Sequence, residues 1–241
     1  MFFPYLHYIV DTFGKSDELT DPVTFFNEQP VTSADKTFYM LRKSIVEGQI
    51  SPGSKLNEAE LSTTYEVSRA VVREAINRLE SCRLVERKAN VGARVIELTK
   101  EGLIELYQIR ESLEGMAARL AAQNMIDEEI VELNQLLNSH FETVQDGESY
   151  YQEAGDVDFH YRIILGSKNN QLISFLVDGL YHLIRMYRVQ FGMAGPRVTT
   201  AFDEHKHIVR AIVNRDAELA EILMRRHIMY SRVNIEAKMN Q

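Results

Sequence analysis

Four side chains that can bind a metal ion stand in the C-terminal part of the sequence. Asp156 and His160 lie four residues apart, which places a carboxylate and an imidazole on one face of a helix. His205 and His227 follow in two later segments. Together they form an N₃O ligand set without sulfur, which suits Zn²⁺, Ni²⁺, Mn²⁺ or Fe²⁺. Histidines on separate helices are also typical hydrogen-bonded core residues, so the spacing alone leaves both interpretations open. Three other histidines are interpreted as structural: His140, His182 and His207.

A second candidate group lies earlier, in the segment 106–122. Arg110 and Glu114 are four residues apart and can form a surface ion pair on a helix. Arg110 can instead point inward and bind an anion through its two-pronged guanidinium. The sequence does not choose between these. The packing stripe of this helix is expected at Leu106, Ile109, Leu113, Ala117 and Leu120.

Two arginines at the start of another helical segment suit recognition of DNA. Arg69 and Arg73 lie one turn apart, and Ser68 stands where a helix N-cap belongs. An arginine pair at the start of a helix can reach base edges in the major groove, while the free N–H groups there favour phosphate. Arginines on an amphipathic helix are also common as a solvated face. The opposite face is an apolar stripe of Val72, Ala75, Ile76 and Leu79.

The elements around this helix favour the DNA-binding interpretation. Residues 57–65 predict a short helix joined by about three residues to the arginine helix, as in a helix-turn-helix. The β-rich runs 84–87 and 93–96 flank a basic, glycine-containing segment at 88–92, which predicts a hairpin. A further helix is expected at 34–48, capped by Ser33. Three helices followed by a hairpin make a winged helix.

The rest of the chain predicts a mostly α protein. Residues 1–32 have no sustained periodicity and are interpreted as a loose extension, followed by a winged-helix domain at 33–98 and an all-helical bundle at 99–241. Asp127 and Asp216 are expected N-caps in the bundle. Its helices are expected at about 100–124, 128–146, 149–166, 170–193, 197–214 and 217–238.

Composition and charge limit the class of protein. The 241 residues are 45% hydrophobic and 26% charged, as in an ordinary globular protein. Cys82 is the single cysteine, which excludes an intramolecular disulfide and a cysteine-based zinc finger, and no apolar run approaches a membrane span. The first residues lack the basic start and cleavage site of a signal peptide, so a cytoplasmic protein is expected. The net charge is −8, yet residues 31–100 carry +3, so positive charge lies where phosphate would be met.

Taken together, these motifs resemble the GntR-type bacterial transcription regulators, in particular the FadR subgroup with an FCD ligand-binding domain. The similarity covers about residues 34–238. The N-terminal half matches at 48–56, 67–75, Leu79-Glu80, Leu84-Val85 and 92–95. The C-terminal half matches at Arg110 to Ala122, Asp156 to His160, 167–169, Glu204 to Ile208 and His227.

The sequence also departs from this family at several positions. Glu66 and Arg83 stand where the family commonly has glycine, which puts non-glycine residues where a positive φ is expected. Val91 replaces an arginine often found before the wing glycine and removes one expected DNA contact. Ala70-Val71 replaces a common Thr-Pro, so the operator sequence is expected to differ.

The resemblance implies a ligand-responsive transcription regulator that binds a pseudo-palindromic, double-stranded DNA operator as a homodimer. Ser68, Arg69, Arg73 and Gly92 would contact DNA, and Arg110 and Asn169 would bind a small organic acid. Asp156, His160, His205 and His227 fall where metal-binding members place their ligands, which implies a bound Zn²⁺, Ni²⁺ or Mn²⁺.

Two other interpretations of the metal site remain. One is a metalloenzyme, either a non-haem iron oxygenase or a zinc enzyme that activates water. The other is a metal that is structural or is itself the signal. No paired acid and base can be placed beside the metal from the sequence, and an enzyme leaves the winged helix unexplained.

Overall fold

The computed structural model describes residues 32–88, 91–145, 155–191 and 196–240, so the expected extension at 1–32 lies almost wholly outside the described residues. Three helices and a hairpin form the first domain, as predicted: α2 (Ser33–Val46), α3 (Glu58–Thr64), α4 (Arg69–Ser81), β1 (Val85–Lys88) and β2 (Gly92–Val95). The strands are antiparallel, with Val85 opposite Val95 and Lys88 opposite Gly92. The predicted apolar stripe of α4 is fully buried against α2 and the hairpin.

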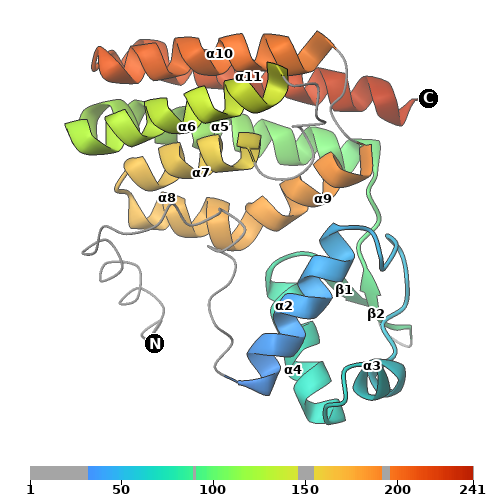
Figure 1. Cartoon of the computed structure of the whole chain (residues 1–241). Coiled ribbons are helices and arrows are strands. Elements are labelled where there is room, and N and C mark those ends of the chain that lie inside the picture. Colours follow the sequence, from blue (N-terminus) through green and yellow to red (C-terminus); the bar gives the residue numbers. More distant parts are fainter. Residues whose placement is uncertain (1–31, 89–90, 146–154, 192–195, 241) are drawn as a thin grey trace.

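Helices alone make up the described part of the second domain, which confirms the predicted mostly α fold. They are α5 (Lys100–Asn124), α6 (Asp127–Gln145), α7 (Gly155–Gly166), α8 (Asn170–Ser174), the π-helix η2 (Phe175–Leu180), α9 (Tyr181–Phe191), α10 (Pro196–Val213) and α11 (Ala217–Met239). Figure 1 shows them stacked, with α10 and α11 on one side of α5 and α6, and with α7, α8 and α9 on the other. Because α5 is central, it contacts α7, α10 and α11.

The sequence of α5 explains its central place. Four alanines on its inner side are fully buried: Ala117, Ala118, Ala121 and Ala122. At Gly115 a Cβ would lie 2.6 Å from Cγ of Arg225, so only glycine allows α11 to pack this closely. The expected stripe was wrong at Ile109, which is 45% exposed, because α5 turns Arg110 and Glu114 inward instead.

Three expected features of the helices also need correction. Thr32, not Ser33, is the N-cap of α2, because Asp35 three residues later completes a reciprocal capping box with Thr32. The expected helix 170–193 is interrupted by the π-helix η2. Asp127 is the first residue of α6 rather than its cap, whereas Asp216 caps α11 as predicted.

Helix α9 joins the two domains. Met186 is fully buried in the apolar core of the winged helix, while Ile184 and Tyr187 belong to the core of the helical domain. The Tyr187 hydroxyl donates a hydrogen bond to the carbonyl of Thr99, in the segment between the domains, at 2.9 Å. Helices α2 and α9 are in contact, and the side-chain amide of Gln190 in α9 lies against Gly48, at the end of α2. A displacement of α9 would therefore be felt by both domains.

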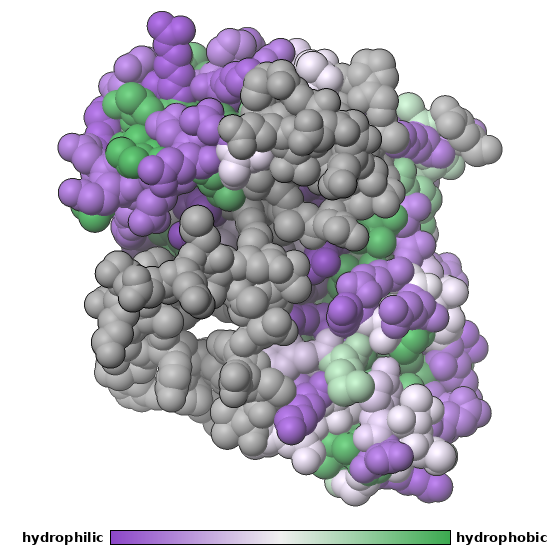
Figure 2. Space-filling model, viewed as in Figure 1, coloured by the Kyte–Doolittle hydropathy of each residue, from purple (hydrophilic) through white to green (hydrophobic). Residues whose placement is uncertain are grey.

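The surface carries apolar side chains among charged ones over both domains (Figure 2). None of the helices in the described part of the chain is long and apolar enough to span a bilayer.

Candidate functional site

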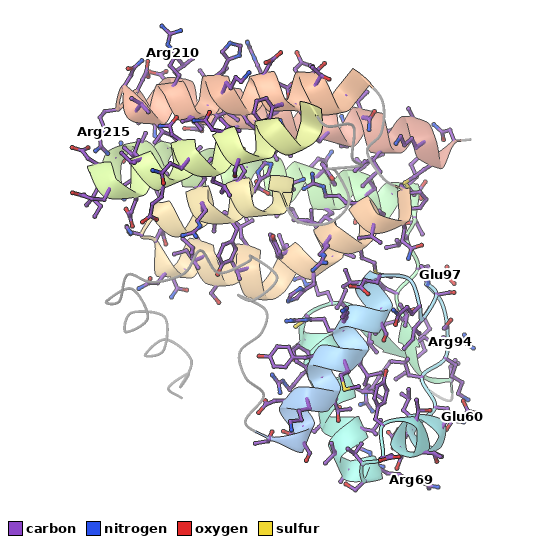
Figure 3. All side chains as sticks on the ribbon, viewed as in Figure 1. Glu60, Arg69, Arg94, Glu97, Arg210 and Arg215 are labelled. Atoms are coloured by element: carbon purple, nitrogen blue, oxygen red, sulfur yellow. The ribbon has the colours of Figure 1, made fainter. Side chains whose placement is uncertain are left out.

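Helix α4 presents its polar end to solvent. Ser68 caps it, accepting a hydrogen bond from the Val71 amide at 3.3 Å, as predicted. Arg69 is exposed at the first position of the helix. Figure 3 shows Arg69 at the end of the molecule farthest from the helical domain. A cation at a free helix start, pointing away from the rest of the chain, can enter a DNA groove without rearrangement.

Arg73 is also exposed, and a carboxylate already fixes its position. Its Nε and Nη2 donate to the two carboxylate oxygens of Glu58, the first residue of α3, at 3.2 and 2.8 Å. This pair connects the two helices of the helix-turn-helix, so contact with DNA requires Arg73 either to exchange Glu58 for DNA or to use its remaining donors.

The wing is built on glycine, as expected. Gly92 has φ +90°, and its nearest side-chain neighbour is Lys55, which keeps a cation beside the hairpin. Val91 is exposed. The tip residues 89–90 lie outside the described residues.

The two departures from glycine adopt the conformation that glycine would favour. Glu66 has φ +54° and Arg83 has φ +57°, so the predicted positive φ is confirmed at both positions. The fold tolerates the cost of this conformation, about 1 kcal/mol for each residue.

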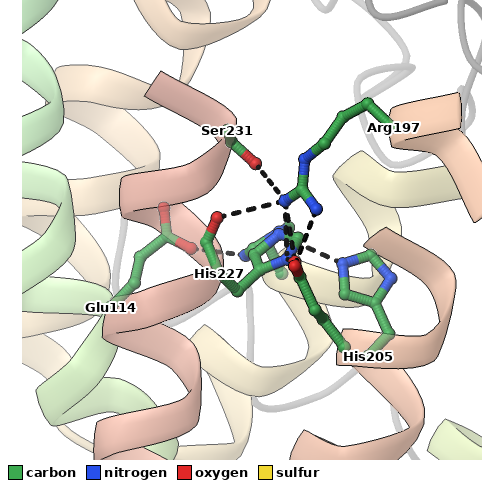
Figure 4. Close-up of polar contacts among 7 residues, drawn as sticks. Glu114, Arg197, His205, His227 and Ser231 are labelled. Carbon is green, nitrogen blue, oxygen red and sulfur yellow. Dashed lines mark hydrogen bonds and ion pairs between the residues drawn. The ribbon is translucent and has the colours of Figure 1, made fainter. Parts of the chain in front are cut away.

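Three buried histidines converge in the helical domain (Figure 4). His160 comes from α7, His205 from α10 and His227 from α11, and their ligand nitrogens all lie within 4.8 Å of one another. Nε2 of His227 is 3.1 Å from Nε2 of His160 and 3.2 Å from Nε2 of His205. Two nitrogens held about 2.1 Å from a shared ion are about 3.0–3.4 Å apart at octahedral or tetrahedral angles. The spacing of these nitrogens therefore fits a metal site.

In His160 and His227, a carboxylate bound to Nδ1 determines which ring nitrogen carries the proton. Nδ1 of His160 donates to Glu114 at 2.5 Å, and Nδ1 of His227 donates to Glu204 at 2.7 Å. Each neutral ring has one proton, so Nε2 of both rings carries a bare lone pair. Two lone pairs facing each other at 3.1 Å repel unless a cation lies between them. Carboxylates that orient ligand histidines in this way are typical of metal centres.

Burial favours the neutral form of all three rings. It lowers the pKa of His160 despite the opposing effect of Glu114, and it lowers those of His205 and His227 well below the usual range. Neutral imidazole is the form that binds a metal. The ring of Phe159 stacks on His205, with ring centres 4.0 Å apart, and fixes its orientation.

The fourth predicted ligand cannot be placed. Asp156 belongs to α7, one turn before His160, but its side chain lies outside the described residues.

Arg110 forms neither the surface ion pair nor the free anion-binding group that the sequence allowed. It points inward and is buried, yet its Nε donates to Glu114, so a buried ion pair replaces both the surface pair and the free anion clamp. Burial alone would raise the pKa of Glu114, but Arg110 and His160 outweigh it and lower the pKa to about 2. Glu114 is thus an ionised carboxylate that contacts both Arg110 and His160.

Three residues of this site were not predicted from the sequence: Arg188, Arg197 and Ser231. Arg197, at the start of α10, donates to both oxygens of Glu204 at 2.8 and 2.7 Å, and also to the Ser231 hydroxyl at 3.2 Å. Arg197 and Glu204 are seven residues apart, and this two-turn spacing was the available signal. Arg188 of α9 is buried and close enough to contribute to the lowered pKa of His205.

The described contact of Asn169 is a local one. Asn169 caps α8, its side-chain oxygen accepting from the Leu172 amide at 3.1 Å. Its contact with the effector stays a prediction. His182 is buried and hydrogen-bonded, as its structural interpretation predicted, and His207 is exposed.

Both domains of the chain match known protein families. Residues 34–95 match the model for bacterial regulatory proteins of the gntR family, and residues 105–229 match the FCD domain. The Nta operon transcriptional regulator of Aminobacter aminovorans is 33% identical over 184 residues, covering 73% of this chain and 82% of that protein. A probable D-xylose utilization operon transcriptional repressor of Paenarthrobacter nicotinovorans is 28% identical, covering 76% and 80%. Among solved structures, E. coli McbR/YncC has a TM-score of 0.70 at 21% identity, covering 88% of this chain and 100% of that chain, and so shares the fold.

Proposed function

The chain belongs to the GntR family of bacterial regulatory proteins and carries an FCD domain, and from that premise we propose a homodimeric repressor that responds to a small carboxylate. It is a DNA-binding transcription regulator and not an enzyme, so the metalloenzyme alternative is set aside. The observation that carries the effector part of the proposal is the convergence of three buried histidines from three helices.

His160, His205 and His227, with Asp156, would hold one divalent ion, Zn²⁺, Ni²⁺ or Mn²⁺. When bound, the ion would supply positive charge that a carboxylate can meet. Arg110, Arg188 and Arg197 lie close enough to lower the pKa of His205, although Glu114 pairs with Arg110 and Glu204 pairs with Arg197. Such a site favours an anion over a neutral or cationic ligand.

DNA recognition is proposed for the exposed start of α4 and for the wing. Arg69 and Arg73 would contact base edges, Ser68 would leave the helix start open to phosphate, and Gly92 would let the wing approach the backbone. The arrangement supports this because Arg69 projects away from the helical domain.

The homodimer is proposed to form along α5 and α11, which lie side by side. Exposed apolar side chains recur there at helical spacing, Ile109 and Met116 on α5 and Ile222, Tyr230 and Val233 on α11. A self-complementary patch on each subunit gives a twofold dimer, whose symmetry a pseudo-palindromic operator matches.

Helix α9 is proposed to carry the signal between the sites. Arg188 lies close enough to His205 to lower its pKa, while Met186, two residues earlier, is buried in the winged-helix core. An acid that binds one position of α9 better than another would shift how the DNA-binding domains are held.

Operator affinity tests the proposal. Fluorescence anisotropy would measure binding of the full chain to its upstream DNA at fixed salt, first without metal, then with Zn²⁺, Ni²⁺ or Mn²⁺ alone, and then with metal and a panel of small acids. We expect an acid to change the operator affinity beyond the effect of metal, whereas an effect of metal alone would make the ion the signal.

A variant tests the DNA-binding residues. Arg69→Ala should weaken specific binding about ten- to a hundredfold. Arg210→Ala, at the opposite end of the molecule (Figure 3), is the matched control. Equal operator affinity of Arg69→Ala and wild type would overturn the DNA assignment.

A further inference from the structure

Three buried polar atoms in the helical domain have no hydrogen-bond partner among the described residues. They are the Tyr107 hydroxyl of α5, Nε of Arg197 in α10 and Nδ2 of Asn234 in α11. Buried polar groups in native proteins are nearly all hydrogen-bonded, because an unpaired one loses water without compensation. These three helices also supply the histidines of the cluster or the carboxylate that contacts them. The three unpaired groups therefore need an explanation.

The residues that carry these atoms lie near the histidine cluster or its partners. The guanidinium of Arg110, one turn from Tyr107, lies 5.1 Å from the centre of the Tyr107 ring. Arg197 reaches across His227 and binds its carbonyl and the Ser231 hydroxyl (Figure 4). Asn234 is three residues after Ser231 and seven after His227, so the three share a face of α11.

The register of α5 against α11 also relates Tyr107 to Asn234. Ion pairs join Glu111 to Arg225 at 3.5 Å and Lys100 to Glu236 at 3.3 Å, which shows that α5 and α11 run antiparallel. Tyr107 lies between these two pairs on α5, and Asn234 lies between them on α11. Tyr107 and Asn234 therefore lie in the same stretch of the bundle as His227, and the hydrogen bonds of Arg197 to the His227 carbonyl and the Ser231 hydroxyl place Arg197 there as well.

The chemistry of the three atoms defines what they can bind. Arg197 Nε and the Asn234 amide nitrogen can only donate, and the Tyr107 hydroxyl can donate or accept. A ligand must therefore offer acceptor oxygens. Glu204 already balances the charge of Arg197, and Glu114 balances that of Arg110. With Tyr107 and Asn234 neutral, the stretch has no excess positive charge for a second carboxylate.

We propose that Tyr107, Arg197 and Asn234 form the subsite for an uncharged, oxygen-rich end of the effector, such as the hydroxyl groups of a hydroxy acid. This rests on the proposed function, in which the carboxylate of the same molecule lies at the histidine cluster. The effector class is then a polyhydroxy monocarboxylate rather than an alkanoate or a dicarboxylate.

Acids of matched length test the proposed chemical class of the effector. The full chain, in excess Zn²⁺, is titrated calorimetrically with acids of three to seven carbons in sets of three: the polyhydroxy acid, the alkanoate and the dicarboxylate of equal length. In at least one set the hydroxy acid should bind about tenfold or more tightly than both others. The proposal is overturned if no hydroxy acid binds more tightly than its matched acids.

Variants test the residues. Tyr107→Phe and Asn234→Leu should each reduce the preference for the hydroxy acid about tenfold, while Tyr65→Phe, at the end of α3 in the winged helix, should leave it unchanged. Without ligand, the melting temperature of Tyr107→Phe should not fall, because the removed hydroxyl has no partner. An unchanged preference in both subsite variants would place the subsite elsewhere. If alkanoates or dicarboxylates alone alter operator affinity, the subsite fails and the proposed function stands; if no acid does, the proposed function itself fails.

Discussion

Arg42 of α2 lies 3.2 Å from Nε2 of His182 in α9, and this contact joins the winged helix to the helical domain. The Arg42 guanidinium also lies over the rings of Phe38 and Tyr39. Burial lowers the pKa of Arg42 to about 10, so it remains charged at neutral pH. Burial, with Arg42 adding to it, lowers the pKa of His182 to about 3, so His182 stays neutral and accepts the hydrogen bond.

The His182 contact predicts acid sensitivity. The histidine has a pKa near 6.5 when unfolded and about 3 when folded, so between these values the unfolded chain binds more protons. Stability from this group is complete above pH 6.5 and is lost as pH falls toward 3. At pH 5 the loss should be about 2 kcal/mol. His182→Gln keeps an acceptor for Arg42 but cannot titrate.

Denaturant unfolding at pH 7.5 and pH 5 measures this loss. The three cluster histidines also have lowered pKa values in both proteins, so the difference between wild type and variant isolates His182. An equal loss of stability in wild type and His182→Gln would contradict the assignment.

Met186 predicts how the two domains are coupled. Met186→Ala leaves a cavity where α9 enters the winged-helix core and should cost about 2–5 kcal/mol of stability. The ratio of operator affinities with and without saturating acid should move toward one, while calorimetry finds the same acid affinity as in wild type. A full response in this variant would mean that the signal bypasses α9.

Glu204 predicts how the metal is held. Glu204→Gln removes the charge that orients His227 and should weaken metal binding about tenfold. Asp203→Asn is the matched control, because Asp203 is exposed and contacts Lys206 instead. Competition with a metal-binding dye measures both affinities, and equal weakening in the two variants would count against the role of Glu204.

The apolar surface of α11 predicts the oligomeric state. Ile222→Glu places a charge on the proposed dimer surface and should give monomers in sedimentation velocity, with weaker binding to a two-half-site operator. Ile126→Glu changes an exposed residue between α5 and α6, outside that surface, and should remain dimeric. Dimers in both variants would move the interface elsewhere.

Local patterns predicted much of this molecule. The stripe of α4, the Ser68 cap and the positive φ of Glu66 depend on residues within a turn or two of each other, and the sequence contains that information. The cap of α2 was misplaced because Thr32 and Ser33 can both serve, and only the reciprocal bond of Asp35 distinguishes them.

The site was less predictable because it depends on packing between distant helices. His160, His205 and His227 had the right chemistry, but spacing does not state that three helices converge. Arg197 was missed because its partners Glu204 and Ser231 lie on two helices. The inward turn of Arg110 accompanies its buried ion pair with Glu114, which also contacts His160 on another helix.

The last prediction concerns the buried pair of Arg110 and Glu114. An alanine substitution of Arg110 alone would not show whether this residue contacts the effector. Arg110→Ala would leave the Glu114 carboxylate buried beside His160 without its cation, which should cost about 3–5 kcal/mol of stability. A lost response to acid in that variant would then report partial unfolding as readily as a lost ligand contact. Arg110→Met with Glu114→Gln removes both charges while keeping volume, so its cost should be well below the sum of the two single substitutions. Denaturant unfolding of the four proteins measures this coupling, and additive costs would show that the two side chains do not act as a pair. The double variant, once shown to be folded, is the protein in which the acid response should be measured, and a wild-type response there would remove Arg110 from the effector site.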